Sequence, residues 1–533
     1  MPAGETSDSL SVATWIPRRN VRLALTGAIV LYALSAFALA AVKSPWSDEG
    51  WFAAPAYNLA FRGFMGTDVL EPSGHYLNAY LKGIHEHTYV VPPVHILQLA
   101  AWFRVFGFSL MAARSLSIVW GAVALLALFT LVSKLVNQTV GMVAVALAAC
   151  DFPLLWGAAD VRMDVPCMAV CLCALASYVQ LREKRFQLAF ILANGLFAIA
   201  FLMHPNALIA FCAFGFLVLS QDRRRLRWSV VAWAALPYLS GLAAWSVYIL
   251  QAPVDFRIQF LANAAGRNSI RMKGLVEPWM AIWNEIVVRY LSFYGFYAVW
   301  ISGRVSHWML LVPAAYCVAF FSLATRPRLI RDRTQGTLLA LLIVYFLAMS
   351  FFIGFKAHGY LVYILPLYDA VLALWAWRCW QGSRAARRWA VAVIAVFAGV
   401  NWYMIGMKIG EDSYRNEYLP CAHYVRTIAG PGKTIYAIAA LGFSVPYSDF
   451  IDDGRLGFFT HRKADYILLD RSYSQWLLIY QRDEPAVYSY IQDLFEHEYR
   501  VAFQSGAYKV YERLAKENPH AMPIEGERYA PRD

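Results

Sequence analysis

Long apolar runs recur along the first four-fifths of this 533-residue chain, and they constrain its fold more than any other feature. Several runs reach the roughly 20 residues that an α-helix needs to cross a bilayer core. The sequence is 59% hydrophobic and only 15% charged, whereas soluble domains carry about 25% charged residues. These properties predict an α-helical membrane protein with many spans.

Eleven runs are candidate spans by apolar length. They are Leu23–Val42, Ser115–Val136, Val140–Trp156, Val165–Leu181, Gln187–Met203, Ala207–Ser220, Trp228–Leu250, Ser306–Ala324, Gly336–Gly354, Tyr360–Trp377 and Trp389–Met407. Two shorter stretches, Val94–Gly107 and Ile286–Ile301, contain internal arginines, so we expect them to lie in the interface or to re-enter it. Because either stretch could instead cross, the expected total is about 11–13 spans.

Lysines and arginines gather in short clusters between the apolar runs. With the N-terminus inside the cell and the spans alternating, all four clusters face the cytoplasm, as the positive-inside rule requires. The clusters are Arg182–Arg185, Arg223–Arg227, Arg326–Arg333 and Arg384–Arg388. A nucleic-acid partner would need basic residues gathered on one surface. The net charge of +12 therefore reflects the cytoplasmic ends of the spans, and we expect no nucleic-acid partner.

The composition divides the chain into four parts. We expect a cytoplasmic segment (1–20), a membrane domain (21–409) whose outer loop 43–111 carries interfacial helices, an extracytoplasmic α/β domain (410–516) and a disordered tail (517–533). The expected location is an inner (plasma) membrane. The elements expected in the α/β domain are strands at Thr434–Ala440, Ala464–Leu469, Tyr499–Phe503 and Ala507–Tyr511, and an amphipathic helix at Asp483–Glu498.

Two groups of acidic residues fall on the outer side. Asp48 and Glu49 follow the first span directly, and adjacent carboxylates beside a bilayer are costly unless they are solvated or used. Asp160 and Asp164 flank an arginine in a tight turn between two spans. The acids of that turn either pair with this arginine or form a second acidic site facing Asp48 across an outer cavity.

Basic and histidine side chains also gather on this side. Lys82, His85, His87 and His95 lie near Pro92-Pro93, which opens a short helix. Substrate binding or plain interfacial histidines are the favoured interpretations. A metal site is the weaker alternative, because histidines two residues apart on a loop are a weak metal signal. The sequence assigns no cofactor, and a divalent metal stays open.

The start of the span near residue 360 offers a phosphate site. Lys356, with His358 and Tyr360, would place a cation and hydrogen-bond donors at headgroup depth, suited to the phosphate of an anionic lipid. The alternative is a lysine that extends to the interface beside an aromatic belt.

The order of these features resembles the polytopic GT-C glycosyltransferases, most closely the branch with the protein O-mannosyltransferases and the lipid A aminoarabinose transferase. The likeness covers most of residues 20–410, and it rests on the order and shared sidedness of motifs that are not specific singly. The matching elements are Asp48-Glu49, Pro92-Pro93, the Arg114-Ser-Leu-Ser entry to a span, the Asp160–Asp164 turn and the Lys356…Tyr360…Pro366 element.

The resemblance implies a glycosyltransferase that moves a hexosyl or pentosyl unit, with inversion, from a polyprenyl-phosphate donor to a lipid, polysaccharide or protein acceptor on the non-cytoplasmic face. Asp48 would be the general base, and Glu49 would orient it or contact the acceptor. The implied acceptor or sugar side comprises Asp160, Asp164 and His95. The implied donor-phosphate side comprises Lys356, His358, Tyr360, Arg114 and Lys82.

Other classes of protein remain as alternatives. A transporter or flippase of a lipid-linked or anionic substrate would show broken helices with polar groups near the bilayer midplane. Here the apolar runs read as mostly unbroken, and the ionisable residues gather at one face. A structural subunit for envelope polymers is a third interpretation, in which Asp48 would be dispensable.

Overall fold

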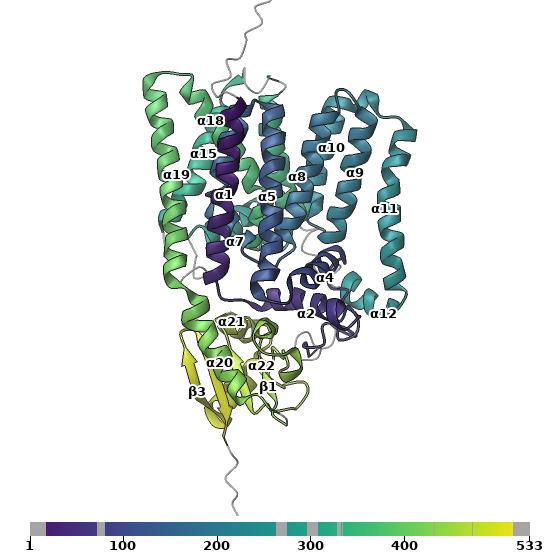
Figure 1. Cartoon of the computed structure of the whole chain (residues 1–533), viewed down its shortest axis with the longest axis vertical. Coiled ribbons are helices and arrows are strands. Elements are labelled where there is room, and N and C mark those ends of the chain that lie inside the picture. Colours follow the sequence, from purple (N-terminus) through teal and green to yellow (C-terminus); the bar gives the residue numbers. More distant parts are fainter. Residues whose placement is uncertain are drawn as a thin grey trace, which may run out of the picture.

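The computed structural model describes residues 18–71, 80–262, 274–295, 307–327, 332, 334–430, 432–471 and 473–514. The tail expected at 517–533 and nearly all of the N-terminal segment lie outside these residues. In Figure 1 the long helices form an upright bundle, and a small sheet lies below it with the C-terminal helices.

Each predicted apolar run coincides with a helix, or a pair of helices, of the bundle. These are α1 (Arg18–Val42), α5 (Leu110–Leu135), α6 (Gln138–Ala148), α7 (Phe152–Ala158), α8 (Asp164–Leu181), α9 (Phe186–Met203), α10 (Ala207–Leu217), α11 (Trp228–Ile249), α15 (Leu311–Ala324), α17 (Gln335–Phe352), α18 (Leu365–Trp380) and α19 (Arg384–Glu411). Of the described residues, eight helices are long and apolar enough to span a membrane, or nine if α6 and α7 form one broken span. The count is lower than expected partly because α10 and α18 have only 11 and 16 residues.

The predicted span Val140–Trp156 is not one straight helix, because the axis bends by 66° between α6 and α7. Asp151 begins the second helix as its cap and accepts a hydrogen bond from the Leu154 amide at 3.4 Å. Pro153 follows in the first turn. Proline lacks the amide that a continuous helix would need and disfavours helical geometry at the residue before it.

The break places a buried acid inside the bundle. The Tyr316 hydroxyl lies 2.6 Å from Asp151 Oδ2 and 3.0 Å from Asp369 Oδ1, and all three side chains are buried. A tyrosine hydroxyl has one proton to donate. A single hydroxyl proton therefore serves two buried carboxyl groups.

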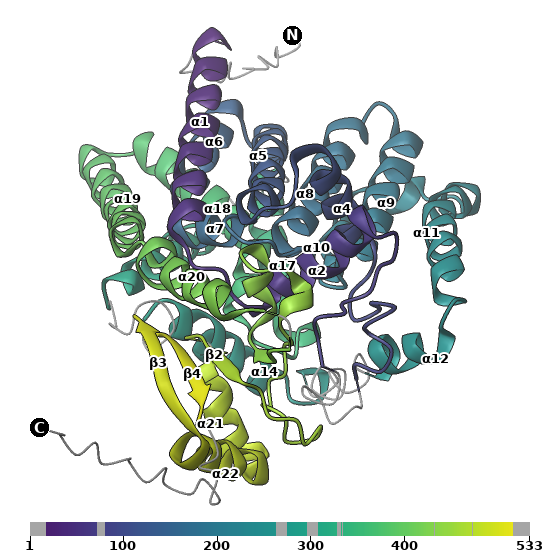
Figure 2. The same ribbon diagram turned by 60° about the horizontal axis from the view of Figure 1, so that its bottom comes forward.

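Two helices lie across the end of the bundle that faces the sheet (Figure 2): α2 (Ser47–Phe61) and α4 (Val94–Phe106). Ala53 and Ala56 of α2 share a hydrophobic core with Leu99 and Phe103 of α4. The helix expected at Val94–Gly107 is thus confirmed as a short apolar helix packed on α2.

Short helical segments complete the membrane part. They are η1 (Val218–Asp222), η2 (Arg223–Arg225), α12 (Pro253–Phe256), η3 (Arg257–Ala262), α14 (Pro278–Asn284), η4 (Glu285–Leu291), η5 (His307–Leu310) and η6 (His358–Tyr363). The stretch expected at Ile286–Ile301 begins within η4, and its end lies outside the described residues.

A four-stranded sheet forms the C-terminal part, in the order β1-β2-β4-β3. β1 pairs with β2 in parallel, and the other pairs are antiparallel. The predicted strands and helix are confirmed in position, although β1 has only two residues. The elements are η7 (Tyr414–Tyr418), α20 (Leu419–Ile428), β1 (Ile435–Tyr436), η8 (Ala439–Phe443), η9 (Tyr447–Asp449), β2 (Tyr466–Leu469), α21 (Tyr473–Asp483), α22 (Pro485–Asp493), η10 (Leu494–Glu498), β3 (Tyr499–Ser505) and β4 (Tyr508–Arg513).

The Asp151–Tyr316–Asp369 contact yields the first testable prediction. Tyr316→Phe removes the shared hydroxyl and leaves the two buried carboxyls without it, which should cost about 1–3 kcal/mol of stability. The thermal unfolding temperature of the purified protein in detergent measures the loss. Tyr403→Phe is the control, because Tyr403 is 57% exposed on α19. Equal unfolding temperatures for the two variants would contradict the prediction.

Candidate active site

A fully buried ion pair fixes the start of α2. Arg114 donates from Nε to Glu49 Oε1 at 2.8 Å and from Nη2 to Oε2 at 2.7 Å, and both side chains are 0% exposed. The same guanidinium donates to the carbonyls of Ala40 and Lys43, both at 2.7 Å. The pair therefore ties the end of α1, the start of α2 and α5 together.

This geometry corrects two expectations. Arg114 cannot reach a donor phosphate in this structure, because its donors are spent on Glu49 and on the end of α1. Glu49 cannot contact an acceptor, because its oxygens also accept hydrogen bonds from the amides of Val161 and Trp46, each at 3.2 Å. Both residues are buried, and their hydrogen bonds hold the end of α1, the start of α2 and the 160–164 turn together.

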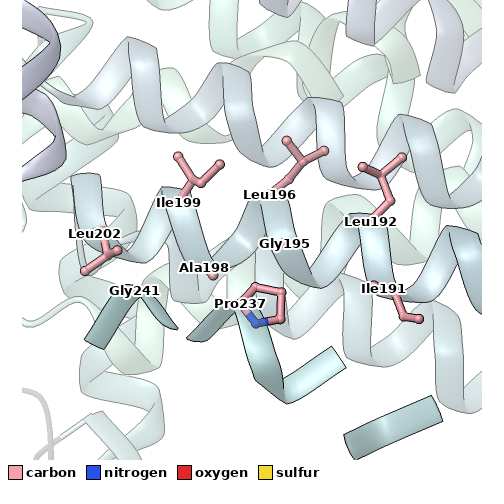
Figure 3. Close-up of a pocket in the computed structure, with 9 residues that line it drawn as sticks. All are labelled: Ile191, Leu192, Gly195, Leu196, Ala198, Ile199, Leu202, Pro237 and Gly241. Atoms are coloured by element: carbon pink, nitrogen blue, oxygen red, sulfur yellow. The ribbon is translucent and has the colours of Figure 1, made fainter. Parts of the chain in front are cut away.

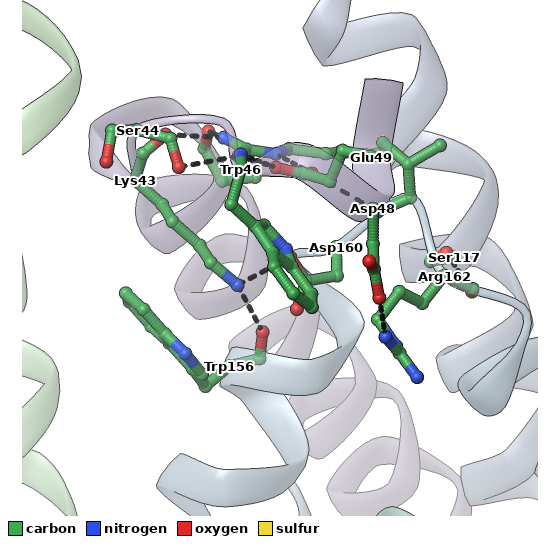
Figure 4. A network of polar contacts seen from close by, with 12 residues as sticks. Lys43, Ser44, Trp46, Asp48, Glu49, Ser117, Trp156, Asp160 and Arg162 are labelled. Carbon is green, nitrogen blue, oxygen red and sulfur yellow. Dashed lines mark hydrogen bonds and ion pairs between the residues drawn. The ribbon is translucent and has the colours of Figure 1, made fainter. Parts of the chain in front are cut away.

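Asp48, the neighbour of Glu49, points the other way (Figure 4). It forms an ion pair with Arg162, and its side chain is 32% exposed. Arg162 also donates from Nε to Asp164 Oδ2 at 2.7 Å. The acidic turn and the Asp48–Glu49 pair, more than 110 residues apart in sequence, therefore meet as the sequence suggested.

The two acids of the 160–164 turn, Asp160 and Asp164, are less accessible to solvent than Asp48. Asp160 Oδ1 lies 2.6 Å from Lys43 Nζ and accepts a hydrogen bond from Trp46 Nε1 at 2.9 Å (Figure 4). Burial lowers the pKa of Lys43, and the Asp160 carboxylate opposes that shift. The side chains of Asp160 and Asp164 are only 10% and 4% exposed. Asp48 is thus the most accessible acid of this set.

We call Asp48, Asp160 and Asp164 the carboxylate cluster. A second group, the cation cluster, consists of Glu285, Arg289 and Lys356. Glu285 Oε1 lies 2.6 Å from Arg289 Nη1, and Glu285 Oε2 lies 2.9 Å from Lys356 Nζ. Two cations and one carboxylate give this cluster a net charge of +1. Burial lowers the pKa of Lys356, and Glu285 opposes that shift.

Tyr360 connects the two clusters. The guanidinium carbons of Arg162 and Arg289 each lie 5.9 Å from the centre of its ring. The His204 ring lies 5.7 Å from the same ring, and its Nε2 is 3.9 Å from Asp164 Oδ1. A cation near an aromatic face is attracted to it. Tyr360 therefore contacts both Arg162, the partner of Asp48 and Asp164, and Arg289 of the cation cluster.

His358 stacks on Phe293 at 5.6 Å between ring centres, and the charged groups that act on it are Arg162, Lys43 and Asp160. Burial, with the positive charges of Arg162 and Lys43, lowers the pKa of His358 to about 4. His358 is therefore a neutral imidazole at physiological pH, able to donate one hydrogen bond and accept another.

The remaining expected residues are not brought into either cluster. Lys82 is exposed, and its carbonyl accepts a hydrogen bond from Gln259 at 2.8 Å. His95 is 0% exposed; its Nε2 lies 2.9 Å from the Val161 carbonyl and its Nδ1 lies 3.1 Å from Gln98. Burial lowers the pKa of His95 to about 4. The His95 side chain thus contacts the backbone of the acidic turn at Val161. It is buried and is not placed to contact a sugar acceptor.

The alternative of a histidine metal site finds no support in the described residues. His95 is occupied as above, His87 stacks on Tyr89, and His85 is exposed beside Glu86. Within the described parts of the chain, no group of three or more histidine, cysteine or acidic side chains is placed to hold a metal ion.

Sequence reasoning missed three contributors: Lys43, Glu285 and Arg289. Glu285 and Arg289 are four residues apart, the spacing at which helical side chains meet. An acid and an arginine at that spacing in an otherwise apolar stretch were the available signal. Lys43 offered none beyond its position at the end of the first span.

An apolar groove of about 470 Å³ runs between α9 and α11 (Figure 3). Its lining is entirely hydrophobic, and small residues such as Gly195 and Gly241 open the space between the helices. The groove extends to Leu202, two residues before His204 of the site. A lipid chain in the bilayer has the chemistry to fill it.

Comparison with known proteins agrees with this architecture. Residues 90–249 match one sequence family, dolichyl-phosphate-mannose-protein mannosyltransferase. No curated protein sequence matches the chain significantly.

Solved structures extend the likeness to nearly the whole chain. ArnT from Cupriavidus metallidurans, bound to undecaprenyl phosphate, aligns with a TM-score of 0.57 at 14% identity, over 93% of this chain and 98% of that one. The oligosaccharyltransferase of Archaeoglobus fulgidus, in complex with Zn and sulfate, aligns with a TM-score of 0.53 at 13% identity, over 86% and 70% of the chains. The archaeal AglB with an inhibitory peptide and a dolichol-phosphate gives a TM-score of 0.51 at 13% identity, over 93% and 75%.

At these identities the structural likeness concerns the fold. The chain has the fold of the GT-C glycosyltransferases, and the resemblance carried by its sequence motifs is confirmed. The chain is thus similar in fold, and over residues 90–249 in sequence, to membrane glycosyltransferases.

The buried Glu49–Arg114 pair gives the second prediction. Glu49→Gln leaves Arg114 buried without its counter-charge, which should cost about 3–5 kcal/mol of stability. Thermal unfolding in detergent measures the change. Glu512→Gln is the control, because its partner Arg500 is 67% exposed and such pairs contribute at most about 1 kcal/mol. A Glu49→Gln protein as stable as this control would show that the pair is not a structural support.

Proposed function

We propose that this protein transfers a hexose or pentose from a polyprenyl-phosphate carrier to an envelope acceptor on the non-cytoplasmic face of the plasma membrane. The observation that supports this most is that Asp48, a partly exposed acid, is connected through Arg162 and Tyr360 to the cation cluster. A base and an anion-binding group are the two parts that such a transfer needs. The acceptor is a lipid, a polysaccharide or a protein.

In the proposed reaction, an acceptor hydroxyl attacks the anomeric carbon of the sugar. Its proton passes to the Asp48 carboxylate, which the ion pair with Arg162 holds in place. The new bond joins the acceptor oxygen to the anomeric carbon. The bond from that carbon to the phosphate oxygen breaks, and a single displacement of this kind inverts the configuration.

The leaving polyprenyl phosphate gains negative charge as this bond breaks. Lys356 and Arg289 would bind that phosphate by exchanging partners that they hold in this structure, which are Glu285 and, for Lys356, the carbonyls of Met349 and Ser350. His358 and Tyr360 would add hydrogen bonds. Fixed cations at the place where charge develops stabilise the transition state more than the ground state. The carrier's isoprenoid chain would lie among the membrane helices, for which the groove between α9 and α11 offers an apolar path.

The sidedness is also part of the proposal. Helix α2, which carries Asp48, lies at the end of the bundle that meets the C-terminal sheet (Figure 1). The links after α8 and α10, which carry the arginine clusters, lie at the other end. The positive-inside rule places those arginines in the cytoplasm. The C-terminal part and the site would therefore face outward.

Asp48→Asn tests the role of the base. A general base contributes about 10²–10⁴-fold to a rate, so the rate of sugar transfer from a labelled polyprenyl-phosphate sugar should fall by at least about 100-fold. Glu183→Gln is the control, because Glu183 is a largely exposed acid at the opposite end of α8. If the Asp48→Asn variant transferred sugar at the rate of the control, Asp48 would not be the general base.

The pH dependence tests the role of His358. Its pKa, lowered to about 4, keeps the imidazole neutral between pH 5.5 and 8. His358→Gln should therefore lower the transfer rate without changing the shape of the pH–rate profile in that range, because neither side chain titrates there. A rate decrease toward low pH that disappears in His358→Gln would show that the histidine gains its proton in this range.

A further inference from the structure

The backbone of α2 touches the backbone of η8 in the C-terminal part at one glycine. A Cβ atom on Gly50 would lie 2.2 Å from Ala439 C and 2.2 Å from Ala440 N. Real Cβ contacts are never this short, and both opposing atoms belong to the backbone, so neither can rotate away. Only glycine permits this approach, and it occurs two residues after Asp48.

One buried carboxylate fastens the same contact. Asp452 Oδ2 accepts hydrogen bonds from the Ala439 amide at 2.7 Å and from Trp51 Nε1 at 3.2 Å. The Asp452 backbone amide donates to the Val69 carbonyl at 2.7 Å. This residue therefore joins η8, α2 and the outer loop at one point.

The segment before Asp48 is held from the same side. The Tyr508 hydroxyl donates to the Pro45 carbonyl at 3.2 Å, and the Ser44 amide donates to Ser413 Oγ at 3.1 Å. Contacts with the C-terminal part thus lie on both sides of Asp48 in sequence. From the membrane side, the neighbouring Glu49 is held by Arg114.

We propose that the C-terminal α/β part is a positioning element for the active site, and that Gly50 and Asp452 are the positioning residues that set the location of Asp48. This inference rests on the proposed function, in which Asp48 is the base. A base must lie within hydrogen-bond reach of the proton it removes, and a displacement of about 1 Å can cost about 100-fold in rate. The membrane helices alone secure one side of the short segment that carries Asp48; the C-terminal part secures the other.

The test compares four variants in the transfer reaction with a polyprenyl-phosphate sugar. Gly50→Ala forces η8 away from α2, and Asp452→Ala removes both hydrogen bonds. Asp452→Asn keeps an oxygen that can accept both of them. Gly410→Ala is the matched control, because a Cβ on this α19 glycine meets no atom within 4 Å.

The expected result is a decrease in kcat of about 10–100-fold for Gly50→Ala and Asp452→Ala. Their KM for the donor should stay within about threefold, because none of the described contacts of η8 reaches Lys356 or Arg289. Asp452→Asn should recover most of the rate, and Gly410→Ala should match the unmodified protein. A general loss of stability would not produce both the lower kcat with an unchanged KM and the recovery of kcat in Asp452→Asn.

Hydrogen–deuterium exchange over residues 43–61 provides a readout that does not depend on activity. Exchange there should be faster in Gly50→Ala and Asp452→Ala than in Asp452→Asn and Gly410→Ala. Unchanged kcat in the first two variants, or equal changes in kcat and KM, would overturn the positioning role. If the unmodified protein transfers no sugar, the proposed function fails and the positioning role fails with it, although the exchange data would still report whether the two parts are docked.

Discussion

The Glu49–Arg114 pair is the interaction on which the rest of the site depends. It lies where three chain segments meet, with neither side chain exposed to solvent, and it satisfies carbonyls at the end of α1 that would otherwise lack partners. Because Glu49 turns inward to meet Arg114, its neighbour Asp48 is directed toward Arg162 and partial exposure. One buried charge pair thus decides which of two adjacent acids is available for chemistry.

The second feature of the site is that the carboxylate cluster and the cation cluster are connected through one aromatic ring. Arg162, which pairs with Asp48 and Asp164, and Arg289 of the cation cluster each lie 5.9 Å from the centre of the Tyr360 ring. Such an arrangement suits a reaction in which a proton leaves one reactant while negative charge develops on the phosphate of the other. A transporter would instead place its binding groups near the membrane midplane. The Asp151–Tyr316–Asp369 contact is a buried polar group within the bundle, and Asp369 Oδ2 has no hydrogen-bond partner among the described residues.

The sequence predicted the helices well because apolar length and charge asymmetry are local properties. It indicated that Asp48 and the 160–164 turn lie near each other for the same reason, since both follow directly from span ends; their roles in catalysis stay predictions. It misassigned Arg114, because an exposed arginine and one paired with an acid 65 residues away look alike in sequence. It missed the break at Asp151, because counting apolar residues gives little weight to Pro153. It missed Arg289 because the cation cluster forms only when Glu285, which pairs with Arg289, also meets Lys356 from another segment.

The central claim is that the two clusters form one site for a polyprenyl-phosphate-linked sugar. A cryo-electron microscopy structure with bound polyprenyl phosphate tests it most directly. The account predicts phosphate density in contact with Lys356 and Arg289, with Asp48 facing the space where the sugar would project. Phosphate bound at the arginine-rich end of the bundle, or separated from Asp48 by packed protein, would contradict it.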